Sequence, residues 1–153
     1  IITVEDEELI VSFLDMVENH KMVVENSGLL TVAALKHLPP ENKRVVSILS
    51  GGNMDVITMS SVVQHGLIQR GRIFTVCVLL PDRPGMLLSV ASIIARENGN
   101  VIKLEHNQFV STNRNAAVEL RVTVEAFGED HKRQIVDALE AGGFDPSIVQ
   151  TSL

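Results

Sequence analysis

The sequence predicts an α+β protein with two parts, residues 1–71 and 72–153. The second part shows strand and helix patterns in the order β-α-β-β-α-β. The first part shows helical patterns on both sides of one unbroken apolar run, residues 44–50. Such a run is typical of a strand buried on both faces. Gly71 follows the last helical pattern of the first part and separates the two, because glycine commonly ends helices.

Composition limits the classes of function. The chain has 153 residues, 45% of them hydrophobic, and a formal net charge of -6 at pH 7. This charge argues against nucleic-acid binding, which needs a basic surface. Neither a membrane-spanning apolar run nor a secretory signal is visible. The single Cys77 cannot form an internal disulfide and suits a buried position in a reduced protein. We therefore expect a cytoplasmic protein that binds no membrane and, since it begins with Ile1, is part of a longer chain.

The first predicted element is a helix that starts near residue 5. Thr3 and Asp6 resemble a capping box, and the acids of residues 5–8 suit the positive end of a helix dipole. Its buried face comprises Ile10, Phe13, Leu14 and Val17. The acidic run could also suggest a metal site, but four acids in a first turn usually serve the dipole and solubility. We expect no metal there.

The next elements of the first part lead to a glycine-rich turn. We expect a helix over residues 29–37, a buried parallel strand over 44–50 and a helix over 54–70. Ser50-Gly-Gly-Asn53 joins this strand to the last helix. In open α/β sheets, ligands collect at the carboxyl ends of strands, where such turns meet helices. Taken alone, the turn would serve equally as a tight strand–helix connection.

The second part begins with a strand that runs directly into a helix. Pro81 and Pro84 end the strand near Leu80, since proline cannot donate ladder hydrogen bonds. Gly85 then permits a sharp turn and leaves the first helical amides uncovered, a setting that attracts carboxylates and phosphates. Alone, this would be an ordinary strand-to-helix connection. The apolar stripe of the helix comprises Leu87, Leu88, Val90, Ala91, Ile93 and Ile94.

The remaining elements complete a split β-α-β plan. We expect strands over residues 101–110 and 116–126 joined by a polar loop at 111–115, then a helix over 129–141 and a short strand within 147–153. The strand 116–126 alternates apolar and polar residues, so one face meets a core. This order is the ferredoxin-like fold. The residues expected to face inward are Ala116, Val118, Leu120, Val122, Val124, Ala126, Ile135, Ala138 and Leu139.

With Asp-Arg-Pro-Gly at 82–85 after its first strand, this part resembles an ACT domain, the amino-acid-sensing module of metabolic enzymes. The resemblance implies a homodimer paired along strand 101–110, with amino-acid effector sites between subunits. The amides of Met86 and Leu87 would hold the effector carboxylate, and Asn100 its amino or carboxylate group. His106 could equally be plain surface, and Asp82 could simply pair with Arg83. The implied effector-binding residues are Asp82, Gly85, Met86, Leu87, Asn100, Ile102 and His106.

The first part resembles the end of the catalytic domain of threonine ammonia-lyase (threonine dehydratase). The resemblance lies in Val-Val-Glu-Asn-Ser-Gly at 23–28, Val-Ala-Ala-Leu at 32–35 and the run at 45–55 that contains Ser-Gly-Gly-Asn. These enzymes use pyridoxal phosphate (PLP) on a fold-type II scaffold, and several bacterial members carry a single C-terminal ACT domain. The resemblance implies that PLP meets Ser50 at its pyridine nitrogen, Gly51 and Gly52 beside the ring, and Glu25 nearby. Asn26 stands where the family has Pro or Gly.

The lysine that binds PLP in this family has no counterpart, and neither has the phosphate loop. None of the five lysines lies in a matching motif; they are Lys21, Lys36, Lys43, Lys103 and Lys132. We therefore expect the regulatory C-terminal portion of an enzyme that converts L-threonine to 2-oxobutanoate and ammonia, as in isoleucine biosynthesis. Alone it should be inactive and bind no cofactor. The alternative is a freestanding ACT-type sensor or interaction module, which would not need the strand ending in Ser-Gly-Gly-Asn.

Overall fold

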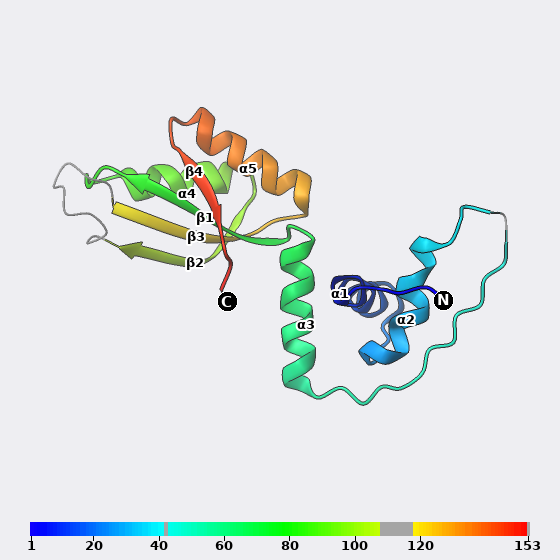
Figure 1. Ribbon diagram of the computed structural model, residues 1–153. Coiled ribbons are helices and arrows are strands. Elements are labelled where there is room, and N and C mark those ends of the chain that lie inside the picture. Colours follow the sequence, from blue (N-terminus) through cyan, green and yellow to red (C-terminus); the bar gives the residue numbers. More distant parts are fainter. Residues whose placement is uncertain (42, 108–117, 153) are drawn as a thin grey trace. The chain divides into compact units, whose positions relative to one another are not determined.

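The computed structural model describes residues 1–41, 43–107 and 118–152. The chain divides into two compact units, Ile1–Gln69 and Arg70–Leu153 (Figure 1). Each unit has a hydrophobic core of its own, so each is described separately.

The first unit is helical. Its elements are α1 (Asp6–Asp15), the π-helical turn η1 (Met16–His20), η2 (Asn26–Leu29), α2 (Leu30–Ala33), η3 (Ala34–His37) and α3 (Val56–Gln69). The predicted helix over 29–37 is helical throughout, but it alternates between 3₁₀ and α geometry. Its start is tightened because Gly28 donates its N–H to the Glu25 carbonyl at 2.9 Å.

The cap of α1 differs from the prediction. The N-cap residue is Glu5, and its backbone N–H donates to the Glu8 carboxylate at 2.8 Å. A capping box is therefore present, but it is shifted two residues from the predicted Thr3–Asp6 pair. Threonine is a more usual N-cap residue than glutamate, but here the side chains of Glu5 and Glu8 form the two reciprocal bonds of the capping box.

The core of the first unit forms where α1, the η2–α2 segment and α3 meet. A methyl group added to Gly66 of α3 would lie 3.3 Å from Ile10 Cγ2 and 3.4 Å from Leu14 Cδ2, so glycine allows α1 and α3 to approach closely. The buried residues of this core are Leu9, Phe13, Met16, Val24, Leu29, Ala33 and Val62.

The strand predicted over residues 44–50 is not formed. The structure shows no helix or strand from 43 to 55, and Val46 and Ile48 are 88% and 76% exposed. Only Leu49 and Met54 of this segment pack against the core. A strand requires neighbouring strands that pair with its backbone, and in the described part of the chain no strand pairs with this segment.

The second unit has the predicted ferredoxin-like fold. Its elements are β1 (Ile73–Leu80), α4 (Met86–Arg96), β2 (Asn100–Asn107), β3 (Val118–Glu125), α5 (Glu129–Ala141) and β4 (Pro146–Val149). The strands form one antiparallel sheet in the order β2-β3-β1-β4. β2 and β4 are therefore the edges, and β2 is exposed along its whole length. The predicted loop 111–115 and the end of the predicted second strand lie outside the described residues.

The core of this unit lies between the sheet and helices α4 and α5 (Figure 1). Leu88, expected in the apolar stripe of α4, is instead 66% exposed, and Met86 packs against the core in its place. Thr123, expected on the outer face of the sheet, is buried, and its hydroxyl shares a hydrogen bond with that of Thr75 at 2.9 Å, which satisfies both groups. Cys77 is buried as predicted, and burial raises the pKa of its thiol.

Candidate functional site

A cavity of about 340 Å³ lies where β1 turns into α4. Five of the predicted effector-binding residues line it, namely Asp82, Gly85, Met86, Leu87 and His106. Gly85 is the N-cap of α4 with φ of +91°, a left-handed conformation that favours glycine. Sequence reasoning missed Val118 at the cavity, although its position follows from its pairing with Leu80 across the sheet.

In the described part of the chain, the first turn of α4 has two amides without a backbone acceptor, and one of them belongs to Leu87, which lines this cavity. The Met86 N–H points toward the Arg83 carbonyl at 3.4 Å, so it is not the free donor that was predicted. Ser89 closes the turn, because its N–H donates to the Gly85 carbonyl at 2.9 Å. Within the described residues, Leu87 and Leu88 have no backbone acceptor at this end of the helix. Of these two residues only Leu87 lines the cavity, so its amide is the donor available to a carboxylate there.

Asn100 and Ile102 do not reach this cavity within one copy of the chain. Asn100 pairs with Glu125, which pairs with Ile73 at the far end of β1 from the turn. The Asn100 side chain donates to the Glu125 carboxylate at 3.1 Å. His106, opposite Leu120, is at the cavity end of the same edge strand. The predicted effector residues therefore fall into two groups at opposite ends of β2.

The predicted cofactor residues gather in the first unit. Glu25 Oε1 accepts a hydrogen bond from Ser27 Oγ at 2.6 Å, and its Oε2 accepts one from the Asn53 N–H at 3.3 Å. The Glu25 N–H in turn donates to the Gly51 carbonyl at 3.4 Å. Sequence reasoning paired Glu25 with the glycine-rich turn only through resemblance, and it missed Ser27 and Asn53.

The turn is compatible with a pyridine ring on its open side. Ser50 is exposed, and a methyl group added at Gly52 would meet only the Val23 carbonyl oxygen, at 3.6 Å. Asp55 caps α3 directly after the turn, and its hydrogen bonds from Thr58 and Ile57 lower the pKa of its carboxyl group. The Ser50 hydroxyl could therefore serve a ring nitrogen while Asp55 remains an ionised helix cap.

The lysines of the first unit have partners elsewhere. Lys21 donates to the Glu18 carbonyl, Lys36 pairs with Glu8, and Lys43 pairs with Glu41. Among the residues that the structure describes, no group of three or more His, Cys, Asp or Glu is placed to hold a metal ion. No helix of the described segments is long and apolar enough to cross a membrane.

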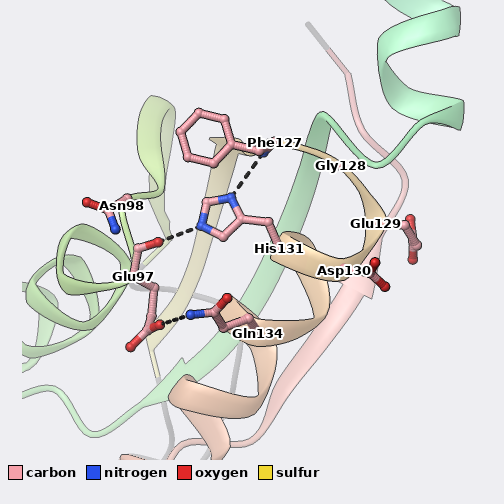
Figure 2. Close-up of a pocket in the computed structure, with 8 residues that line it drawn as sticks. All are labelled: Glu97, Asn98, Phe127, Gly128, Glu129, Asp130, His131 and Gln134. Atoms are coloured by element: carbon pink, nitrogen blue, oxygen red, sulfur yellow. Dashed lines mark hydrogen bonds between the residues drawn. The ribbon is translucent and has the colours of Figure 1, made fainter.

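A second cavity, of about 510 Å³, was not predicted (Figure 2). His131 lies at its centre and stacks on Phe127 with ring centroids 4.8 Å apart. Its Nδ1 accepts the Phe127 N–H at 3.0 Å, and its Nε2 lies 2.5 Å from the Glu97 carbonyl oxygen. Gln134 donates to the Glu97 carboxylate at 2.7 Å. Because both ring nitrogens are already bonded, this histidine is committed to structure.

Curated proteins similar to the chain are named as L-threonine ammonia-lyases or L-threonine dehydratases. An L-threonine ammonia-lyase from Geobacter sulfurreducens is 31% identical over 94% of the chain, and one from Thermotoga maritima is 31% identical over 97%. An L-threonine dehydratase biosynthetic IlvA from Haemophilus influenzae is 30% identical over 94%. The chain spans 36%, 37% and 28% of the lengths of these relatives. No family model matches.

Two solved prephenate dehydratases align with about half of the chain. The Streptococcus mutans structure gives a TM-score of 0.43 at 21% identity, covering 50% of this chain and 40% of its own. The Staphylococcus aureus structure gives 0.41 at 18% identity, covering 50% and 29%. The sequence similarity to the L-threonine ammonia-lyases, in contrast, extends across both units. The chain is therefore similar over nearly its whole length to L-threonine ammonia-lyases, and it corresponds to a C-terminal fragment of such proteins.

Proposed function

We propose that this chain is the regulatory C-terminal portion of a cytoplasmic, PLP-dependent L-threonine ammonia-lyase. The observation that carries the proposal is the match to L-threonine ammonia-lyases across both units, 94–97% of the chain. In this proposal residues 72–153 are an ACT-type domain that binds an amino-acid effector. Residues 1–71 supply one wall of the cofactor site in the catalytic domain.

The cofactor wall would consist of Ser50, Gly51 and Gly52. When bound, PLP supplies the electron sink that elimination of water from threonine requires. The Ser50 hydroxyl would hold the ring nitrogen as a neutral partner. Such a partner leaves the nitrogen largely unprotonated and favours elimination over transamination. The lysine that binds the cofactor would come from sequence outside these residues.

The effector site would lie at the β1–α4 turn. The free amide of Leu87, at the positive end of an 11-residue helix, favours a carboxylate there. Leu87 lines the same cavity and offers an apolar surface to the effector side chain. An amino acid with an apolar side chain, such as isoleucine or valine, fits this combination.

Pairing of two copies along β2 would complete the site. Asn100 and His106 are six residues apart on a strand that rises about 3.3 Å per residue, so about 20 Å separates them. If two β2 edges pair antiparallel about a two-fold axis, the partner's Asn100 approaches the turn of the first copy. The same pairing would satisfy the backbone groups of an exposed edge strand.

The proposal is tested with a matched pair of substitutions at Gly85. Asp and Asn have the same shape and both tolerate positive φ, so Gly85→Asp and Gly85→Asn strain the turn similarly. Only Asp places a carboxylate where that of the effector should bind. Calorimetry with isoleucine, valine, threonine and serine should show a binding signal in the unmodified chain and in Gly85→Asn, and none in Gly85→Asp. Equal binding by the two variants would exclude this turn as the carboxylate site.

A further inference from the structure

Glu25 contacts the glycine-rich turn in three ways. Its two carboxylate oxygens accept hydrogen bonds from Ser27 Oγ and the Asn53 N–H, at 2.6 and 3.3 Å. Its backbone N–H donates to the Gly51 carbonyl at 3.4 Å. The side chain also lies flat against Gly51, where an added methyl group would come within 2.4 Å of Oε1. The carboxylate is therefore already engaged by groups of its own unit.

Gly28 meets the same turn from another direction. A methyl group added there would lie 1.8 Å from the Ser50 carbonyl oxygen and 2.8 Å from Val24 Cγ1. Gly28 is buried, and its φ lies outside the left-handed region, so the requirement for glycine is purely one of space. Only a residue without Cβ allows η2 to approach the Ser50 backbone this closely.

We propose that Glu25 and Gly28 are positioning residues that fix the direction of the Ser50 hydroxyl, and that Glu25 is not a ligand of the cofactor. Gly28 lies against the Ser50 carbonyl, and Glu25 lies against Gly51, so the peptide between Ser50 and Gly51 is held from both sides. With the backbone fixed, the Ser50 side chain keeps only its rotation about χ1 and that of its hydroxyl hydrogen. A donor held in this way loses less entropy when it binds a ring nitrogen.

This inference rests on the proposed role of Ser50, but its first test needs no cofactor. The contacts of Glu25 and Gly28 with residues 50–53 are called the brace. Amide hydrogen exchange at Asn53 in the 153-residue chain reports on it directly. Glu25→Ala should speed that exchange about tenfold, because it removes a charged acceptor. Glu25→Gln keeps two acceptor lone pairs and the shape of the side chain, so it should restore most of the protection.

The glycines provide a second, sterically matched comparison. Gly28→Ala should loosen residues 50–53, whereas Gly52→Ala should not, because its methyl group would meet only the Val23 carbonyl oxygen, at 3.6 Å. If Gly28→Ala unfolds the first unit, the comparison of Glu25→Ala with Glu25→Gln still tests the proposal. Unchanged Asn53 exchange in Glu25→Ala would overturn the proposal.

The final test uses the enzyme that contains this chain, loaded with PLP labelled with ¹⁵N in its ring. The ¹⁵N chemical shift reports the hydrogen bond to the ring nitrogen without any measurement of activity. Glu25→Ala should move it toward the value of Ser50→Ala, and Glu25→Gln should restore it. If Glu25 were instead an anionic ligand, Glu25→Gln would not restore the shift. If Ser50→Ala itself leaves the shift unchanged, the proposed role of Ser50 fails, while the exchange test of the brace still stands.

Discussion

At the scale of single residues, Glu8 is the most strongly perturbed acid in the described structure. Its carboxylate is 12% exposed and lies 2.5 Å from Lys36 Nζ and 2.9 Å from His37 Nε2. The bond from Lys36, followed by that from the Glu5 backbone, lowers the pKa of Glu8 from 4.5 to about 2. These bonds connect the first turn of α1 to η3.

Glu8 should therefore contribute an acid-sensitive part of the stability of the first unit. Because its folded pKa is depressed, this contribution is complete above pH 4.5 and is lost as the pH falls toward 2. Glu8→Gln should be less stable than the parent at neutral pH, and the difference should shrink across that window. Amide exchange of core residues in α1 measures it. Glu7→Gln, in the same helical turn, is the matched control for the loss of one carboxylate from this turn.

The turn at Gly85 and the brace at Glu25 differ in how far sequence could predict them. Two prolines and a glycine after an apolar strand fix a turn by local backbone restrictions, so the exposed helix start was predicted. The contact of Glu25 with Gly51 spans 26 residues and depends on how the chain folds back. No local pattern encodes that distance, so the two residues were associated only by resemblance.

At the scale of elements, strand β1 ended at the predicted residue because Pro81 follows Leu80. The segment 44–50 has an equally strong apolar pattern but remains unpaired. A pattern records which environment a segment suits, whereas a strand also needs hydrogen-bonding neighbours. For residues 44–50 those neighbours are absent from the described chain.

We therefore expect fast amide exchange over residues 44–50 in a monomer of this chain. The same amides should be strongly protected in the longer enzyme, where further strands would pair with them. Strand β1, equally apolar and paired on both sides, serves as the internal control. Slow exchange over 44–50 in a demonstrated monomer would contradict the expectation.

The two sheet edges allow a matched test of dimerisation. Ile102 on β2 is 43% exposed and Ile148 on β4 is 49% exposed. Ile102→Asp should shift a dimer to monomer, because pairing about a two-fold axis brings the two new charges close together. Ile148→Asp should leave the dimer intact, since β4 has only four residues and begins with Pro146. Sedimentation velocity distinguishes the outcomes, and monomeric behaviour of the unmodified chain with bound effector would refute pairing.

At the scale of the whole molecule, each unit holds a separate part of the proposed function. The sheet and its turn were predictable from local patterns within 84 consecutive residues, Arg70–Leu153. In the first unit the helices were predicted as well, but the strand over 44–50 was wrong, because its sequence pattern suits a larger sheet than the described chain contains. The glycine-rich turn nevertheless keeps a defined structure, through Glu25 and Gly28.

The chain alone should make no 2-oxobutanoate from threonine when mixed with PLP. The lysines of the first unit are bonded to Glu18, Glu8 and Glu41, and none lies in the family's lysine motif. Borohydride reduction followed by mass spectrometry should find no PLP attached to a defined lysine. Threonine-dependent formation of the keto acid by the purified chain would contradict this.

The exposed Phe127 ring, stacked on His131, also has a spectroscopic consequence. The chain contains no tryptophan and no tyrosine, so it is nearly silent in near-ultraviolet absorption and fluorescence. Phe127 is 81% exposed, so a larger indole ring could occupy its place without entering the core. Phe127→Trp would create a single fluorophore beside an imidazole, and its emission would report on the second unit alone.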